Sequence, residues 1–367
     1  MPLSLTRTPT LPWPLVCRCA ALHFLVDALC LCCLYLLAER AGGMRLTHVF
    51  IIYNVMAFLT QPLTGWMADV CMKQALPLCL LSGRRLVWAS GGLLAAAVLM
   101  STVMEVTSMF TLPLFIVVAL LLGAGNSLFH VWGGKVVAVA TGNDMRALGV
   151  FVSTGAFGLA VAAVCCSWPL LYVLLAAIGM MMKNPQDPPP APPCEGGEYI
   201  DLLSALSTAE LSAPLPIGRG RGRVCWGRVC WAGVWRVWMG LGLVCLLALI
   251  LFVMLRSYVG GVFSSSMATD GGTLMVLLIG GTAMAGKMAG GWVAKWLGIA
   301  WGLTLMVAAT GACLWLCDAG LAWQMCGLLA INLTMPVTLY MANALLPAHE
   351  GLAFGLLAAA LMPAYLF

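Results

Sequence analysis

Long apolar segments dominate the chain and decide what it can fold into. About eleven runs of roughly 20 mainly apolar residues follow one another, and most are joined by short polar connections. Runs of that length suit transmembrane α-helices, whereas membrane-barrel strands have about ten residues of alternating character. Only 8% of the 367 residues are charged, against about 25% in soluble domains, so lipid must replace water around most of the surface. We therefore predict an all-α, multi-pass membrane protein.

The predicted spans fall into two groups. They cover approximately 15–37, 47–69, 86–104, 111–134, 147–165, 167–183, 237–257, 272–293, 299–317, 321–345 and 351–367. Between the sixth and seventh lies a long polar stretch with a proline-rich, acidic first half and a second half that repeats Gly-Arg-Val-Cys-Trp. The expected organisation is a six-helix bundle over 1–183, a linker loop over 184–236, and a five-helix bundle over 237–367.

The basic residues indicate how the chain is oriented. With the N-terminus inside the cell, all but three of the 18 Lys and Arg residues fall at the inner side, the exceptions being Arg40, Arg45 and Arg256. Cytoplasmic loops carry such an excess, so we expect the N-terminus and the 184–236 loop in the cytoplasm and the chain in the cell (inner) membrane. Arginine interleaved with tryptophan in the loop suits the interface with the lipid bilayer, and we expect no nucleic-acid partner.

A short sequence echo relates the two predicted bundles. Thr64-Gly65-Trp66-Met67-Ala68-Asp69 ends the second span, and Gly290-Gly291-Trp292-Val293-Ala294-Lys295 ends the eighth, which is the second of its half. Related bundles with a binding site between them are a common plan of membrane transporters. Gly65-x-x-x-Asp69, followed by Lys73, resembles the signature of the major facilitator superfamily of secondary transporters.

Within that superfamily, the chain is most similar to the fosmidomycin-resistance type of bacterial efflux protein. The resemblance is carried by His23–Asp27, Tyr53–Phe58 with Gln61-Pro62, Gly125–His130, Gly149–Gly155 and Asn332–Leu339. It implies a two-bundle fold, and twelve spans where we count eleven, so that the twelfth is apparently missing. It also implies secondary transport of a small organic solute by alternating access, as proton-coupled efflux.

Ionisable groups inside spans are costly in lipid and are therefore candidates for function. His23 and Asp27 are four residues apart and share a helix face, where an imidazole beside a carboxylate could carry a proton. Asn126 and His130 repeat this spacing in the fourth span. For both pairs, a structural hydrogen bond between helices is the alternative.

Further polar residues extend the predicted pathway. Tyr53, Asn54 and Gln61 lie on the second span, where they could line a path or bind another helix. Asn332 in the tenth span precedes Pro336, which should break the helix there. Lys287, in the eighth span, is expected to extend its side chain to the cytoplasmic interface.

A conformational gate is predicted at the cytoplasmic ends of the second and eighth spans. Its residues are Gly65, Asp69, Lys73, Gly291 and Lys295. The Asp69 carboxylate could pair with the facing bundle or cap a helix N-terminus and so favour the inward-closed state. Simple determination of topology by loop charge is the alternative.

Motifs of other function classes are absent from the sequence. There is no Gly-x4-Gly-Lys-[Ser/Thr] phosphate loop, Gly-x-Ser-x-Gly elbow or His-Glu-x-x-His pair, so we expect neither ATP drive nor an enzyme. The cysteines lie mostly in apolar runs, and we expect no cofactor and no metal site. A non-transporting membrane protein, receptor-like or an assembly partner on a transporter fold, is the alternative function.

Overall fold

The computed structural model describes residues 11–41, 43–74, 83–182, 227–268 and 272–362, without the side chains of 41–46, 72–74 and 227–240. The described residues are helical almost throughout. The helices are α1 (Trp13–Ala41), α2 (Gly43–Asn54), α3 (Gln61–Gln74), α4 (Gly83–Thr107), α5 (Leu112–Ala140), α6 (Met145–Cys165), α7 (Trp168–Met182), α9 (Gly227–Ala268), α10 (Thr273–Leu297), α11 (Ile299–Trp315), α12 (Leu321–Leu333), α13 (Met335–Leu345) and α14 (Glu350–Ala359). A π-helical segment, η1 (Val55–Leu59), and a 3-10 turn, η2 (Cys317–Ala319), complete the set.

Eight helical stretches in the described part of the chain are long and apolar enough to cross a membrane. The segment α2–η1–α3 supplies one of them, Thr47–Cys71, and α12–α13 another, Leu321–Leu345. Three shorter apolar helices, α7, α11 and α14, complete the eleven predicted spans. The predicted all-α membrane fold is therefore confirmed.

Two of the spans are broken at prolines. η1 ends just before Pro62, and the break between α12 and α13 at Thr334 precedes Pro336. Proline has no N–H for the helical ladder, so the hydrogen-bond pattern must change in the turn before it. The predicted interruption of the tenth span is present, whereas the π-helical turn in the second span was not foreseen.

By its contacts, the chain divides into one unit of Met1–Pro188 with Leu246–Phe367 and a second unit of Pro189–Cys245. Most of the predicted 184–236 loop lies outside the described residues, although α9 begins within it at Gly227. The division into two bundles joined by a cytoplasmic loop stays a prediction.

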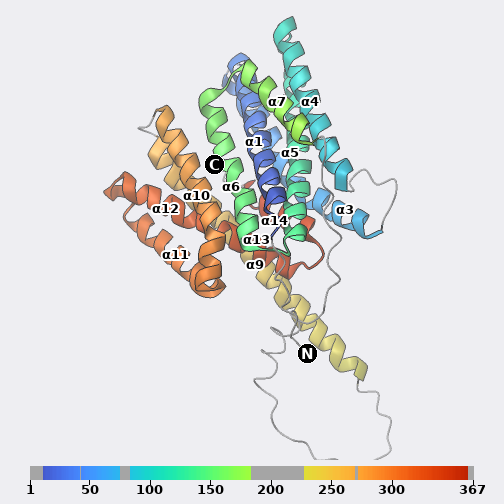
Figure 1. The fold of residues 1–367 in the computed structure, drawn as a ribbon, viewed down its shortest axis with the longest axis vertical. Helices are drawn as coiled ribbons and strands as arrows, with labels where there is room; N and C mark the ends of the chain where they lie inside the picture. The colour runs from blue at the N-terminus through green and yellow to red at the C-terminus, as the bar shows by residue number, and fades with distance from the viewer. Residues whose placement is uncertain (1–10, 42, 75–82, 183–226, 269–271, 363–367) are drawn as a thin grey trace, which may run out of the picture. The chain divides into compact units, whose positions relative to one another are not determined.

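Helix α1 lies at the centre of the packing in the first unit. It contacts α5, α6 and α7, beside which it runs in Figure 1, and its apolar face belongs to a large buried cluster. Gly158 of α6 permits close approach, because a Cβ there would lie 2.4 Å from the carbonyl oxygen of Phe24. The tight packing fixes the polar residues of α1 relative to α5 and α6.

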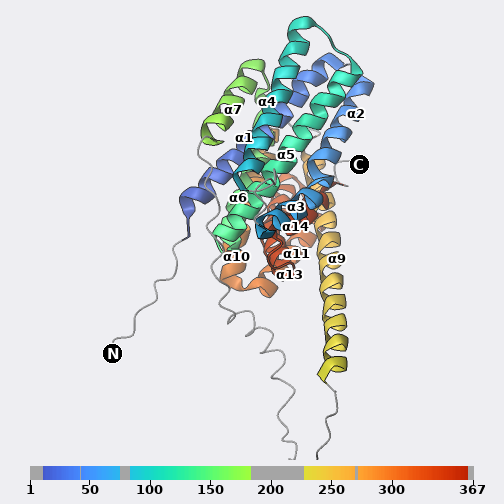
Figure 2. The ribbon, with the colours of Figure 1, turned by 90° about the vertical axis from the view of Figure 1, so that its right-hand side faces the viewer.

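The two most extensive contacts between the early and late parts of the sequence involve α6 and α3. α10 packs along α6, and α14 packs along α3, next to which it lies in Figure 2. Residues of these four helices surround the cavity described next.

Candidate functional site

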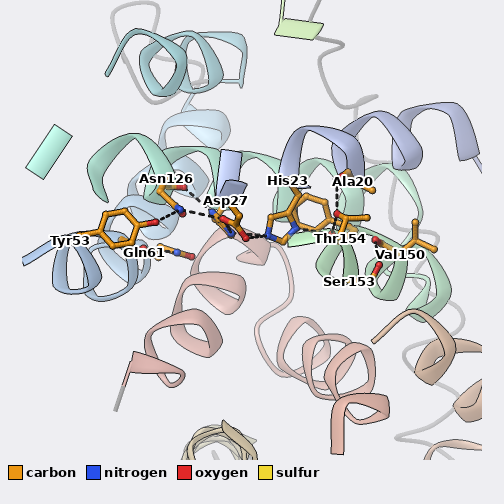
Figure 3. A network of polar contacts seen from close by, with 12 residues as sticks. Ala20, His23, Asp27, Tyr53, Gln61, Asn126, Val150, Ser153 and Thr154 are labelled. Atoms are coloured by element: carbon orange, nitrogen blue, oxygen red, sulfur yellow. Dashed lines mark hydrogen bonds and ion pairs between the residues drawn. The ribbon is translucent and has the colours of Figure 1, made fainter. Parts of the chain in front are cut away.

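A cavity of about 410 Å³ lies among these helices. Its polar wall includes seven of the residues predicted for a pathway: His23, Asp27, Tyr53, Asn54, Gln61, Asn126 and His130. They come from α1, α2, α3 and α5, and Figure 3 shows several of them converging. The remaining wall is mainly apolar. Ligand sites commonly combine such an apolar lining with a few convergent polar groups, in volumes of about 300–1,000 Å³.

Asp27 is the centre of the polar wall. One of its carboxylate oxygens lies 3.2 Å from Nε2 of His23, and the other lies 3.6 Å from Nε2 of His130. The side-chain amide of Asn126 donates a hydrogen bond to Asp27 over 3.3 Å and another to the Tyr53 hydroxyl over 2.7 Å (Figure 3). The two predicted i, i+4 pairs thus form a single network across α1 and α5.

The contacts of the two histidines fit a proton shared between their rings. Nδ1 of His23 lies 2.7 Å from the carbonyl oxygen of Phe151, and Nδ1 of His130 lies 2.9 Å from that of Asn126. A carbonyl oxygen can only accept, so each Nδ1 carries a hydrogen. The Nε2 atoms then face each other 2.8 Å apart, and a hydrogen bond between them needs one more proton than two neutral rings hold. The Asp27 carboxylate beside both rings would supply the compensating charge.

Gly155 of α6 makes room for this network. A Cβ at Gly155 would lie 2.2 Å from Oδ2 of Asp27 and 2.5 Å from Nε2 of His23. Any larger residue would displace the carboxylate or the ring. Gly155 therefore shapes the site.

The π-helical turn places polar groups of the second span at the cavity. Asn54 precedes η1 and Gln61 follows it, and both line the cavity. The Gln61 amide nitrogen donates to the carbonyl of Ala57 over 2.6 Å, while Oε1 of Gln61 has no partner among the described residues. π-helical turns inside helices are frequent at functional sites.

Asn332 does not join the cavity wall. Its amide donates to the Leu328 carbonyl over 2.8 Å, and its Cβ packs against Gly286 of α10. The prediction placed it on the pathway because it lies beside a proline break. The break is present, but the side chain is directed to a neighbouring helix.

Lys287 is placed differently from the sequence prediction, which had its side chain reach the cytoplasmic interface. It lines the cavity instead. About ten residues, or about 15 Å of helix, separate it from the end of α10, which is more than a lysine side chain spans.

The ends of α3 and α14 are closed against each other by the Asp69 carboxylate. Asp69 accepts hydrogen bonds from the backbone N–H groups of Gly351 and Leu352, over 3.1 and 2.9 Å, in the first turn of α14. It also pairs with Nζ of Lys135 at 2.7 Å, and both side chains are buried. A Cβ on Gly65 would lie 2.1 Å from the Gly351 carbonyl oxygen, so the two backbones touch. Lys73 lies in α3, but its side chain is outside the described part.

The second copy of the sequence echo makes the corresponding contact with α6. A Cβ on Gly291 would lie 2.3 Å from the carbonyl oxygen of Met145, the first residue of α6. Lys295 lies 3.5 Å from Asp144, the N-cap of α6. In the first copy, the echo supplies the capping carboxylate. In the second copy, the capping carboxylate is Asp144, at the start of α6 itself, and Lys295 of the echo is the cation beside it.

Asp144 lies outside the spans and is stabilised as a carboxylate. Its side chain accepts from the backbone N–H of Arg146 at 2.9 Å and from the Arg146 guanidinium at 3.0 and 2.8 Å. Partial burial works to raise the pKa of Asp144, but the hydrogen bonds and charge of Arg146, with Lys295, outweigh it and leave the pKa below its ordinary value. The neighbouring Asn143 accepts a hydrogen bond from the amide of Asn343 over 2.7 Å, which adds a contact between α13 and this turn.

Sequence reasoning did not assign a role to Lys135, Phe354 or the first turn of α14. Lys135 was counted only as a topological charge, and no local pattern links it to Asp69. The ring of Phe354 packs over Gly134, where a Cβ would lie 2.3 Å from it, and lines the cavity. Each of these contacts joins residues far apart in the sequence.

His23, Asp27 and His130 are also the set of described residues whose donor atoms could hold a metal ion, all lying within 4.8 Å of one another. Two imidazole ligands of a tetrahedral metal at about 2.0 Å are about 3.3 Å apart. The 2.8 Å between the Nε2 atoms is a hydrogen-bond distance. The geometry therefore fits a shared proton better than a metal.

Comparison with known proteins identifies the fold. No protein-family model matches the sequence, and no curated protein sequence matches it. Among solved structures, a variant of the E. coli fucose:proton symporter FucP aligns with a TM-score of 0.54 at 14% identity, covering 96% of this chain and 89% of that one. The chain therefore shares the fold of FucP, a major facilitator superfamily transporter.

Two further structures with this fold align over a similar length. FucP in the outward conformation gives a TM-score of 0.53 at 14% identity, covering 96% of this chain and 89% of the other. A bacterial homologue of the iron transporter ferroportin, in an outward-facing state, gives 0.53 at 12% identity, covering 96% and 90%. The predicted superfamily fold is confirmed. At these identities the likeness concerns the fold, and function must be argued from the site.

Proposed function

We propose that this protein is a proton-coupled secondary transporter that moves a small organic solute across the cell membrane by alternating access. The observation that carries the proposal is the 2.8 Å contact between the Nε2 atoms of His23 and His130, beside Asp27 in the wall of a ligand-sized cavity. Coupling between solute and proton movement requires a group that gains or loses a proton beside the bound solute. The similar structures add support, since one is a fucose:proton symporter and another a homologue of an iron transporter.

The coupling step follows from charge balance. With the shared proton present, the imidazolium charge is neutralised by the Asp27 carboxylate. When the proton leaves, the carboxylate keeps its charge at the cavity without a cation in contact, which is unfavourable inside a membrane. If solute moves only together with proton entry and exit, the protein avoids leaving the Asp27 charge unpaired. We propose efflux as the direction, in keeping with the resemblance to fosmidomycin-resistance proteins.

The contacts of α3 with α14 and of α10 with α6 would form the gate that opens and closes during alternating access. We propose that the N-terminus, the 184–236 loop and the gate formed by Gly65, Asp69, Lys73, Gly291 and Lys295 are cytoplasmic, so that the structure is closed toward the cytoplasm. Opening this end would require Asp69 to release the first turn of α14 and Lys295 to separate from Asp144. Residues 1–183 and 237–367 would then move as the two bundles.

Transport by the purified full chain tests the proposal. Protein reconstituted in liposomes would be given an imposed pH gradient and a broad panel of labelled organic solutes. At least one solute should move faster than in protein-free liposomes, and collapsing the gradient should stop its accumulation. If no solute moves in any gradient, the receptor-like or assembly alternative replaces the transporter.

A further inference from the structure

Lys287 is a cation in the cavity wall without a contacting counter-ion. Among the described residues, its ammonium has no hydrogen-bond or ion-pair partner, and the charged groups that act on it are Arg256 and Asp27. Arg256 has the same sign, and the Asp27 carboxylate is in contact with the two histidines. A cation within a transmembrane segment needs either water or an anionic partner.

The main chain around Lys287 is fixed by close packing on both sides. A Cβ on Gly286 would lie 2.6 Å from the Leu329 carbonyl oxygen of α12. The carbonyl of Lys287 itself faces Gly149 of α6, where a Cβ would lie 2.7 Å away. In this structure α10 is held closely against α12 and α6 at this point, with Lys287 in the cavity wall.

The rest of the cavity wall suits an apolar body. Its aromatic and aliphatic members include Phe50, Phe58, Phe354, Leu357 and Leu361, and its carboxylate, imidazole and ammonium groups belong to Asp27, His23, His130 and Lys287. Asp27 is already in contact with both histidines, so the Lys287 ammonium is the charged group of the wall that is left for an acidic group on the solute. A solute bearing one negative charge would neutralise Lys287.

We propose that the solute is a small organic anion with an apolar body, whose acidic group pairs with Lys287 while the body contacts the aromatic rings. The proposal rests on the proposed function, because it takes the cavity as the solute site. Its chemistry is that of an aryl or alkyl carboxylate. Neutral and cationic analogues of the same shape leave Lys287 unpaired and bind more weakly.

Binding to the full chain in detergent tests this without any gradient. The probes are phenyl-substituted carboxylates of increasing chain length, from phenylacetate to 5-phenylpentanoate, each with its matched amide and amine, and binding is followed by equilibrium dialysis. Carboxylates should bind at least about tenfold more tightly than their amides, because a hydrogen bond to a charged group is lost in the amide. Lys287→Met should weaken carboxylate binding by about tenfold or more, and Lys287→Arg should stay within about threefold of wild type.

Arg40→Met is the matched control, since Arg40 pairs with Glu105 away from the cavity, and it should leave binding unchanged. Any of four results would overturn the anion site: equal binding of acid and amide, tighter binding of the amine, no carboxylate binding, or carboxylate binding by Lys287→Met equal to that of wild type. Carboxylates that bind through Lys287 but cross no membrane would contradict transport and leave this site standing. If a neutral solute is transported equally by wild type and Lys287→Met, the anion site is contradicted and the proposed transport function stands.

Discussion

The backbone N–H of Gly351 donates to the carboxylate of Asp69 over 3.1 Å, so a side chain of α3 caps the first turn of α14. The same carboxylate pairs with buried Lys135. Orphan N–H groups at a helix start favour a negative charge, and a buried ammonium needs one. One carboxylate therefore connects three helices, and its removal has consequences that can be measured.

Asp69→Asn should lower the free energy of unfolding by about 3–5 kcal/mol, because it leaves the Lys135 ammonium buried without its counter-ion. Denaturation of the purified protein in mixed micelles measures this. Asp318→Asn, at an exposed carboxylate of η2, is the control and should have little effect. Adding Lys135→Met to Asp69→Asn should restore at least half of the loss. Equal stability of the Asp69 and Asp318 variants would refute the role of the pair.

Gly65→Ala should separate α3 from α14, since its Cβ would lie 2.1 Å from the Gly351 carbonyl oxygen. Hydrogen–deuterium exchange should then speed up at the Gly351 and Leu352 N–H groups. Gly92→Ala, with nothing within 4 Å of its Cβ, is the matched control. Unchanged protection of both amides in Gly65→Ala would show that the backbones do not touch.

Gly155→Ala should disrupt the polar centre while leaving the helices folded. Its Cβ would lie 2.2 Å from Oδ2 of Asp27, so the carboxylate must move away from the histidines. We expect coupled proton movement to fall by about tenfold or more, in line with the loss of charge-assisted hydrogen bonds. Gly179→Ala in α7, where a Cβ meets nothing within 4 Å, should behave as wild type. Circular dichroism checks that both variants remain helical.

Asp144 should contribute a pH-dependent stability. Its folded-state pKa lies below the ordinary value of 3.8, so its contribution is fully present above that value and is lost as the pH falls through the folded-state pKa. The difference in melting temperature between wild type and Asp144→Asn should therefore be constant near neutral pH and shrink in strong acid. A difference that grows on acidification would reverse the sign of the linkage.

The sequence predicted which polar residues share a helix face, but not what each face meets. The i, i+4 rule paired His23 with Asp27 and Asn126 with His130, because helix geometry is local. That the two pairs form one network depends on the glycine contacts that bring α1, α5 and α6 together. The length of the apolar runs also predicted the spans, since each needs about 20 apolar residues in lipid.

Lys287 and Asn332 show where local reasoning failed. Lysine near a membrane often extends to the interface, and this general tendency misplaced Lys287. Its helix is held by the contact of its own Gly286 with α12 and by Gly149 of α6. Asn332 lies beside a real helix break, but its Cβ packs on α10. Lys135 was missed for the same reason, since its partner Asp69 lies 66 residues away.

Simultaneous measurement of solute and proton movement tests the central claim most directly. Liposomes containing the full chain, with a trapped pH indicator and a labelled solute, would be compared for wild type, Asp27→Asn and the control Asp318→Asn. Wild type and control should move protons only when solute moves, whereas Asp27→Asn should still exchange solute across the membrane but move no protons with it. Identical solute-dependent proton movement by wild type and Asp27→Asn would contradict coupling at the His23–Asp27–His130 centre.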